Sequence, residues 1–397
     1  MKPMIRSNIC LNAHPLGCEA MVNLWIDRAR AAKPAMIHAM RASGKDAPKT
    51  VLVLGCSTGY GLASRITAAF SLEAATVGVS LEREPSDKKT GTPGWYDNLA
   101  FDNAARESGL YTQTLDGDAF SNETRDRVIA LAKKDGLLFD QVIYSLASPV
   151  RVDPETGVMY RSVLKPIGEA FTGRTFDVVT GEMSEVSIQP ASDEEVASTV
   201  KVMGGEDWEL WIQALEAAGV LAPGCITMAY SYIGPEHTAT IYRGGAIGRA
   251  KEHLESTAHV LSKRLGTRGG AAYVAVNKAV VTRASAVIPV VALYVAALFK
   301  TMKELGLHED CLDQLLRLYR ERLFVKGKVP VDSEGRIRMD DWEMRKDVQD
   351  GTARRFAEAT EINLSETVDL AGFKHDFLEA HGFDMEGVDY DADVTFR

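Results

Sequence analysis

Short runs of aliphatic and β-branched residues recur through the first 150 residues, separated by stretches with the spacing of helices. Four runs are predicted to be strands, at residues 50–55, 75–80, 111–115 and 139–145. The first, TVLVLG, is apolar almost throughout, which is typical of a strand buried on both faces of a sheet. Helices are expected at 62–70 and 122–134. This alternation predicts an α/β fold, a Rossmann-type doubly wound parallel sheet with helices on both faces.

The N-terminal segment and the middle of the chain extend this pattern. Residues 1–18 are irregular and are expected to form a small hairpin, followed by a helix at 19–43. Two more apolar strands are predicted at 225–233 and 271–276, with a helix at 248–265 between them. The sheet is therefore expected to have six strands.

Two segments depart from the alternation of strands and helices. Residues 151–200 are rich in Asp, Gly, Pro, Ser and Thr and predict an insertion without regular strand–helix pattern. Beyond residue 300 the pattern is mainly helical, with one short hairpin expected at 329–339. We expect a single domain over 1–397, with a Rossmann core at 45–300, an insertion at 151–224 and a helical C-terminal extension at 301–397.

Charge and cysteine usage narrow the class of protein. The formal net charge is −10 and no long basic run occurs, so nucleic acid and anionic membranes are poor partners. The five cysteines are scattered, with no CxxC, and predict neither a disulfide framework nor a metal site. The apolar run at 284–299 contains a proline and is shorter than a membrane span, so we expect a buried helix. Without a signal-peptide pattern at the N-terminus, a cytoplasmic protein is expected.

A glycine-rich segment follows the first predicted strand and precedes a helix. Gly55, Gly59 and Gly61 are spaced as G-x-x-x-G-x-G, with Ser57 and Tyr60 between them. Glycines allow a tight turn and a close approach of the backbone to a pyrophosphate, and the helix N-terminus supplies N–H donors. The segment is predicted to bind a dinucleotide; the alternative is an ordinary glycine-rich turn.

An acidic residue ends the second predicted strand, in the sequence SLER. Glu82, after Leu81, lies where a carboxylate can accept hydrogen bonds from the adenosine ribose of NADH and repel the 2′-phosphate of NADPH. Arg83 weakens this inference, because a neighbouring arginine can accommodate that phosphate. The alternative is a solvated glutamate in a charged loop.

Small and polar residues also follow the third and fourth predicted strands. These are Asp118 and Ala119 in DGDA, and Leu146 and Ala147 in SLAS. Ligands of doubly wound sheets bind at the carboxyl ends of strands, so all four are candidates for contacts with the adenosine. They are equally compatible with plain turn chemistry.

Hydride transfer requires a proton donor near the oxygen on which charge develops, and a tyrosine beside a lysine can provide it. Tyr-x3-Lys is absent. Tyr-x6-Lys occurs once, at Tyr319/Lys326. Tyr-x8-Lys occurs three times, at Tyr242/Lys251, Tyr294/Lys303 and Tyr319/Lys328. Tyr294 is expected in the core and Tyr319 on an exposed helix. Tyr242 follows a predicted strand and is therefore expected at the carboxyl edge of the sheet, where ligands bind. The pair Tyr242 and Lys251 is therefore favoured.

Long strings of residues resemble one family. They include KPMIRSNICLNAHPLGC, VLVLGCSTGYGLASRITAAF, GTPGWYDNLAFD, AYSYIGPE, IYRGGAIGRAKEHLE and VNKAVVTRASAVIP, and they run from residue 2 to beyond 380. The chain is similar in these strings to the trans-2-enoyl-CoA reductases and FabV-type enoyl-acyl-carrier-protein reductases. The resemblance implies NADH-dependent reduction of the trans-2 double bond of an enoyl-CoA or enoyl-acyl-carrier-protein.

The same resemblance assigns roles to individual residues. It implies that Tyr242 is the proton donor or enolate stabiliser and that Lys251 supports both Tyr242 and the cofactor. Tyr232 would be a second hydroxyl near the thioester oxygen, Thr282 would lie beside the nicotinamide, and Glu82 would favour NADH. It also implies a monomer whose insertion and N-terminal hairpin help to cover the active site.

Two other functions remain open from the residues alone. A carbonyl reductase acting on a 3-oxoacyl substrate could use the same fold and hydride donor, although the absent Tyr-x3-Lys counts against it. A non-catalytic dinucleotide sensor would bind NADH without turnover. His14 is expected to be structural, and the MGGEDW segment at 203–208 is either part of an acyl pocket or a helix start.

Overall fold

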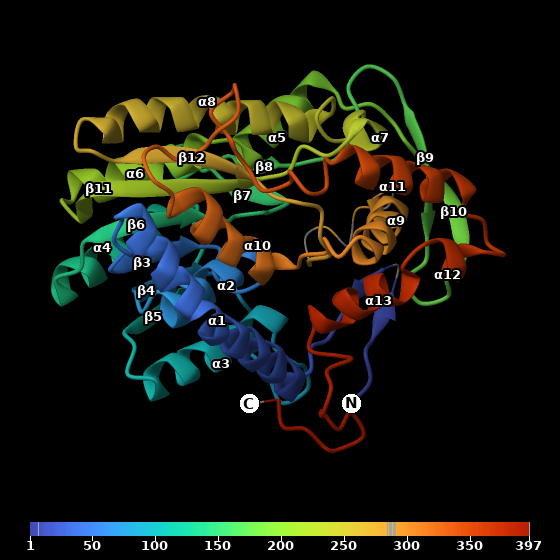
Figure 1. Cartoon of the computed structure of the whole chain (residues 1–397), viewed down its shortest axis with the longest axis horizontal. Coiled ribbons are helices and arrows are strands. Elements are labelled where there is room, and N and C mark those ends of the chain that lie inside the picture. Colours follow the sequence, from blue (N-terminus) through green and yellow to red (C-terminus); the bar gives the residue numbers. More distant parts are fainter. Residues whose placement is uncertain (7, 284, 286–287, 289–290, 397) are drawn as a thin grey trace.

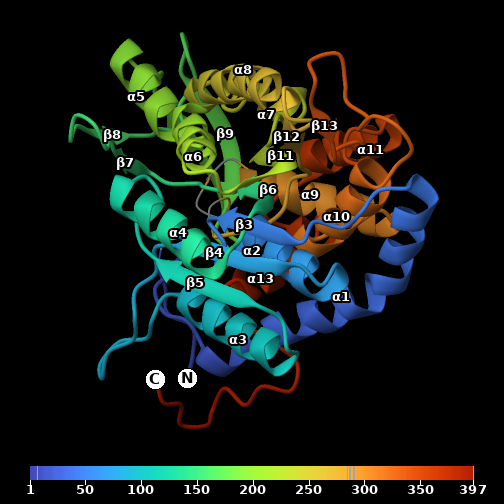
Figure 2. The ribbon, with the colours of Figure 1, turned by 90° about the vertical axis from the view of Figure 1, so that its left-hand side faces the viewer.

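A seven-stranded parallel sheet forms the centre of the computed structural model, which describes residues 1–6, 8–283, 285, 288 and 291–396. Its spatial order is β13-β12-β11-β6-β3-β4-β5. Figure 1 shows the strands from β12 to β5, and Figure 2 also labels β13. The strands are β3 (Thr50–Leu54), β4 (Ala75–Ser80), β5 (Thr112–Asp116), β6 (Phe139–Tyr144), β11 (Leu221–Ser231), β12 (Ala271–Val276) and β13 (Ile337–Arg338). The chain order reverses between β3 and β6, and this switch point is where doubly wound sheets bind ligands.

Alternating side chains of the strands build a core on each face of the sheet. In β3, Val51 and Val53 join one hydrophobic cluster, and Leu52 and Leu54 join the other. The helices of the first face are α1 (Pro15–Ser43), α2 (Gly59–Ile66), α3 (Pro93–Glu107) and α10 (Cys311–Leu318); those of the second are α4 (Asn122–Asp135), α6 (Glu206–Ala217) and α8 (Ala246–Gly266). Figure 2 shows the two layers on opposite sides of the strands. The predicted Rossmann-type class of fold is confirmed.

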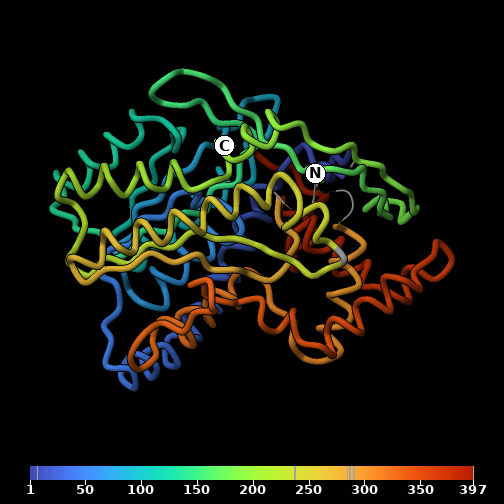
Figure 3. Tube along the Cα trace, turned by 90° about the horizontal axis from the view of Figure 1, so that it is seen from above, coloured from blue at the N-terminus to red at the C-terminus, as the bar shows by residue number. Residues whose placement is uncertain are grey.

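The segment between β6 and β11 has more regular structure than its composition predicted. It forms two antiparallel hairpins, β7 (Val150–Val152) with β8 (Met159–Arg161) and β9 (Phe171–Phe176) with β10 (Met183–Ile188), and then helix α5 (Asp193–Met203). Helix α6 belongs to the core layer instead of to the insertion. In Figure 3 the green β9–β10 hairpin and the red C-terminal helices lie toward the same end of the molecule, where Arg174 Nη1 donates to Ala359 O at 2.9 Å.

Both ends of the chain fold against this core. The N-terminal hairpin is confirmed as β1 (Ile5–Arg6) with β2 (Ile9–Cys10). Helix α1 begins earlier than predicted, because the Nδ1 of His14 accepts a hydrogen bond from Gly17 N at 3.1 Å and caps the helix. His14 therefore has the structural role that was expected.

The C-terminal extension differs from its prediction in two places. The expected hairpin at 329–339 is wrong: Ile337 and Arg338 pair in parallel with Ala275 and Val276 and become the seventh strand. Tyr319 is also not exposed, since it is buried and hydrogen-bonded to Gln141. The remaining elements are α7 (Glu236–Ala239), α9 (Val291–Glu304), α11 (Lys346–Glu358), α12 (Leu364–Thr367) and α13 (Leu370–Glu379), with π-helical turns η1 (Thr67–Ser71) and η2 (Tyr319–Leu323).

Helix α9 contains most of the apolar run at 284–299. It begins at Val291 and is buried along most of its length. Residues 284, 286–287 and 289–290, where that helix was also expected, lie outside the described residues. In the described part of the chain, no helix combines the length and apolar character that a bilayer crossing requires.

A buried ion pair holds α4 to α6. Arg125 Nη2 donates to Asp207 Oδ1, and Tyr144 donates to Asp207 Oδ2 at 3.1 Å. The Arg125→Met substitution would leave this carboxylate without its partner, and we expect a loss of about 3 kcal/mol in the free energy of unfolding by urea. Adding Asp207→Leu should recover most of the loss.

The matched control is Arg249→Met, which removes an exposed pair with Glu252. Its expected cost is below about 0.5 kcal/mol. Equal losses from Arg125→Met and Arg249→Met would show that the buried pair does not stabilise the α4–α6 contact.

Candidate active site

The glycine-rich turn between β3 and α2 is packed too tightly for side chains. Gly55 has φ +83°, and a Cβ there would lie 2.2 Å from the carbonyl oxygen of Ser145, at the end of β6. A Cβ on Gly61 would lie 1.8 Å from Gly55 O, and one on Gly59 would meet the Cγ2 of Thr282 at 3.4 Å. The backbone is therefore bare at the start of α2, and Thr282 lies against it. This arrangement fits a pyrophosphate at the helix N-terminus.

Glu82 is fixed beside this turn by three neighbouring segments. Ser57 Oγ donates to Glu82 Oε1 at 2.6 Å, and the Glu82 N–H donates to Asp116 Oδ1 at 3.0 Å. Arg283 Nη1 lies 3.3 Å from Oε1 and 3.5 Å from Oε2. The carboxylate thus faces the glycine-rich turn at the switch point of the sheet, where the acid that binds the adenosine ribose is expected. Leu81, just before it, is exposed.

The remaining candidates for adenosine contacts lie at the same edge. Asp118 Oδ1 accepts from Phe120 N at 3.0 Å, and Ala119 O accepts from the indole of Trp211 at 2.9 Å. Leu146 is close to Gly55, since its Cδ2 would be 3.1 Å from a Cβ built there. Ala147 is exposed beyond the end of β6. The structure places these residues at the carboxyl edge of the sheet, and their contacts with a cofactor stay predictions.

The hydroxyl of Tyr60 is hydrogen-bonded within the protein. Its hydroxyl donates to the carbonyl oxygen of Lys278 at 2.9 Å and accepts from Gln314 Nε2 at 2.7 Å. Both bonds attach α2 to the segment after β12 and to α10. A cofactor contact of Tyr60 would therefore come from its backbone or ring edge.

Tyr232 and Tyr242 lie together where β11 ends. Their rings meet edge to face, with centroids 5.0 Å apart and an interplanar angle of 85°. Burial, and then the charge of Glu343, raise the pKa of the Tyr242 hydroxyl above its usual value, so it carries its proton at neutral pH. The two tyrosines named from the sequence therefore share one site.

Lys251 lies on α8, which begins shortly after Tyr242. Burial lowers the pKa of Lys251 to about 8, with a smaller opposing effect from Glu255. Among the residues that the structure describes, none hydrogen-bonds to the Lys251 ammonium or to the Tyr242 hydroxyl. Both polar groups are thus free to bind a ligand. The inserted segment lies close by, since Ala246 N, at the start of α8, donates to Lys165 O at 3.0 Å.

A buried carboxylate behind the tyrosines was not identified from the sequence. Glu343 is fully buried, and its Oε1 accepts from Tyr232 at 3.0 Å and from Tyr294 at 2.7 Å. Its Oε2 accepts from Ala279 N at 2.7 Å. These three donors favour the ionised form of Glu343, although burial raises its pKa. Tyr294, expected to be a core residue, is buried but has a polar role.

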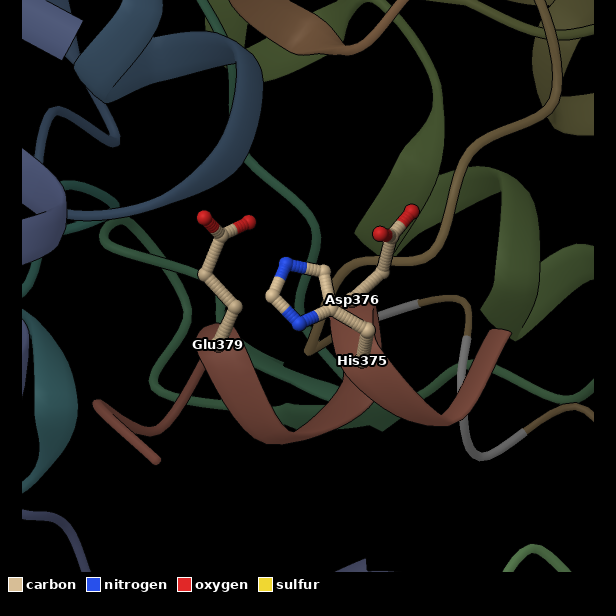
Figure 4. A group of neighbouring side chains, drawn as sticks. All are labelled: His375, Asp376 and Glu379. Atoms are coloured by element: carbon tan, nitrogen blue, oxygen red, sulfur yellow. The ribbon is translucent and has the colours of Figure 1, made fainter. Parts of the chain in front are cut away.

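One group of metal-type side chains occurs among the described residues, on α13. Ligand atoms of His375, Asp376 and Glu379 lie within 4.8 Å of one another, and Figure 4 shows both carboxylates on one side of the helix with the imidazole between them. His375 is paired with Asp384 at 2.9 Å. Burial raises the pKa of Asp376 to about 6 and that of Glu379 to about 7. We assign no cation to this group.

The strand order and the site together define a doubly wound, dinucleotide-dependent oxidoreductase. Family models match three successive segments: the NAD(P)H binding domain of trans-2-enoyl-CoA reductase at residues 1–87, the trans-2-enoyl-CoA reductase catalytic region at 89–324, and an enoyl reductase FAD binding domain at 331–394. The chain belongs to the trans-2-enoyl-CoA reductase family, as its sequence predicted.

Individual relatives agree with this assignment. The chain is 58% identical over 395 residues to the trans-2-enoyl-CoA reductase (NADH) of Treponema denticola, covering 99% of this chain and 98% of that protein. It is 53% identical over 395 residues to the enoyl-[acyl-carrier-protein] reductase (NADH) of Flavobacterium johnsoniae, covering 100% and 97%.

Two solved structures are similar over nearly the whole chain. The trans-2-enoyl-CoA reductase of Treponema denticola in complex with NAD matches with a TM-score of 0.95 and 58% identity, over 99% of this chain and 98% of that one. The enzyme of Clostridium acetobutulicum in complex with NADH matches with a TM-score of 0.93 and 42% identity, over 100% and 98%.

The segment at 331–394 does not fit a flavin dinucleotide of its own. Its strand β13 is the edge of the shared sheet, and the turn that follows, MDDWEMR, contains no glycine. A backbone without glycine there cannot approach a pyrophosphate as the turn at Gly55–Gly61 can.

The lowered pKa of Lys251 predicts a pH dependence. Lys251 is charged below about pH 8 and neutral above it, so support from its charge is lost as pH rises through that value. We expect kcat/KM to fall above about pH 8 in steady-state assays. The Lys251→Met variant should lack this step in its remaining activity, and an unchanged step would assign it to another group.

Proposed function

We propose that the chain transfers hydride from NADH to the β-carbon of a trans-2-enoyl thioester, while Tyr242 stabilises the enolate and supplies a proton. The observation that carries this proposal is that none of the described residues hydrogen-bonds to Tyr242 Oη, close to the end of β11, or to Lys251 Nζ, on α8. A protonated phenol in a buried site can donate to an oxygen that becomes negatively charged.

The class of reaction follows from family membership. The chain is an enoyl-thioester reductase that uses NADH, which confirms the activity, enzyme class and cofactor predicted from its sequence. Fatty acid elongation is the consistent role, since relatives are named for enoyl-acyl-carrier-protein as well as enoyl-CoA. The roles of individual residues are part of the proposal.

NADH would be held by the bare turn at Gly55–Gly61 and by Glu82, with Asp118, Ala119, Leu146 and Ala147 near the adenosine. Bound there, it supplies the hydride. Thr282, in contact with the position of Gly59, would orient the nicotinamide end. Lys251 would hold the nicotinamide ribose and, through its charge, lower the cost of forming a tyrosinate at Tyr242.

Tyr232 takes a different role from the one that the resemblance implied. Its single proton is donated to Glu343, so in this arrangement the hydroxyl can accept a hydrogen bond but cannot donate one to a thioester oxygen. We infer that Tyr232 positions Tyr242 through their edge-to-face contact. Glu343 in turn fixes Tyr232.

We also propose that residues 1–397 work as one unit, as a cytoplasmic monomer. Support comes from the C-terminal extension, whose β13 completes the sheet and whose Glu343 bonds to Tyr232. All proposed site residues thus come from one chain. The five cysteines are free and buried, in agreement with a reducing compartment.

Tyr242→Phe removes the donor and should reduce turnover of crotonyl-CoA by at least ~10²-fold, the usual size of positioned acid catalysis. NADH binding, measured by fluorescence, should be nearly unchanged. Tyr273→Phe, in β12 and outside the proposed site, is the matched control and should retain wild-type turnover. Near-normal turnover by Tyr242→Phe would remove Tyr242 from the mechanism, and preferred reduction of acetoacetyl-CoA would indicate a carbonyl reductase.

Glu343→Gln should lower kcat by about tenfold with a smaller change in KM, because an amide donor would face the hydroxyls or Ala279 N. Tyr294→Phe removes one donor but leaves the Tyr232–Glu343 bond, and should have a smaller effect. In the Tyr232→Phe background, Glu343→Gln should lower kcat little further. Fully additive losses in kcat would show that Glu343 does not act through Tyr232.

A further inference from the structure

The arginine beside Glu82 comes from a distant part of the chain. Arg83, the adjacent residue, has an exposed side chain. Arg283 instead reaches Glu82 from the segment after β12, with Nη1 at 3.3 Å and 3.5 Å from the two carboxylate oxygens. The acid that is expected to read the ribose of the cofactor is therefore paired with a cation 201 residues further along the chain.

This pairing is loose and leaves most of the guanidinium available. One nitrogen spans both oxygens, at distances longer than the ~2.8 Å typical of charge-assisted hydrogen bonds. The shorter bond to Glu82 comes from Ser57 at 2.6 Å. In the part of the chain that the structure describes, Arg283 has no other hydrogen-bonding partner, and its side chain is 31% exposed against 8% for Glu82. Its remaining donors can therefore bind an anion without breaking other bonds.

The N-terminal turn of α3 adds positively polarised backbone beside this carboxylate. A Cβ on Gly94 would lie 2.3 Å from Glu82 Oε1 and 2.6 Å from Ser57 Cβ, so the first turn of α3 touches both residues. The N-cap residue Thr92 makes no side-chain capping bond, and the N–H groups of this turn carry the positive end of a 15-residue helix. Glu82 occupies a place whose surroundings favour negative charge.

We propose that Arg283, and not Arg83, is a specificity-determining residue of the cofactor site: with Ser57 and the first turn of α3 it forms a latent site for a 2′-phosphate, which Glu82 fills. This rests on the proposed function, in which the adenosine ribose lies at Glu82. The carboxylate then favours NADH in two ways. It repels the phosphate, and it neutralises the cation that would bind the phosphate.

The test measures binding without turnover. Isothermal titration calorimetry with NAD⁺, NADP⁺, ADP and 2′,5′-ADP would be carried out on wild type, Glu82→Gln, and Glu82→Gln combined with either Arg283→Met or Arg83→Met. Glu82→Gln should tighten NADP⁺ and 2′,5′-ADP by about tenfold or more relative to NAD⁺ and ADP. Adding Arg283→Met should abolish that gain, and adding Arg83→Met should leave it intact.

Each other outcome contradicts the proposal. No gain in Glu82→Gln would mean that the latent site cannot take a phosphate. A gain that survives Arg283→Met would assign the phosphate to other groups, and a gain lost with Arg83→Met would assign it to Arg83. Failure of the proposed cofactor site is distinguishable, because wild type would then bind neither NAD⁺ nor ADP, and failure of the proposed reaction appears separately as binding without turnover of crotonyl-CoA. Circular dichroism of each variant checks that it is folded.

Discussion

The close approach of backbone at the Gly55–Gly61 turn is the constraint on which the rest of the site depends. The turn lies against the carbonyl of Ser145 and against itself, so any side chain at Gly55 or Gly61 would displace β6 or α2. Because the chain order reverses between β3 and β6, this turn lies at the switch point of the sheet, where a dinucleotide can meet the N-terminus of α2. Glu82, Leu146 and Thr282 are then positioned relative to that one turn.

The main architecture and much of the candidate site could be predicted from sequence, because both follow from local rules. Buried parallel strands appear in the sequence as uninterrupted apolar runs, and the residues that follow them lie at one edge of the sheet. Glu82 was located by this rule, as was Tyr242, whereas Tyr232 was named only from the resemblance. Spacing did not separate Tyr242 from the other Tyr-x8-Lys pairs. Its position after a strand favoured it and the resemblance selected it, and neither tests its role.

What was missed depends on contacts between segments far apart in sequence. Glu343 follows an unremarkable two-residue strand, and nothing in the string DDWEM marks it as a partner of Tyr232 and Tyr294. Arg283 was overlooked for the same reason, since Arg83 adjoins Glu82 in sequence and Arg283 adjoins it only in space. The short strand β13 resembled half of a hairpin because two residues cannot show whether a strand is parallel or antiparallel.

The seventh strand makes the sheet and the candidate site depend on the same late segment of the chain. The first six strands of the sheet precede residue 277, but α2, which follows the Gly55–Gly61 turn, is bonded to the C-terminal extension through Gln314 and Tyr60. Residues 337–343 add both the outer strand and the carboxylate behind Tyr232. Loss of the chain after residue 336 would therefore uncover the edge of the sheet at β12 and remove the hydrogen-bond partner of Tyr232 together, so the sheet and the candidate site cannot be altered independently there.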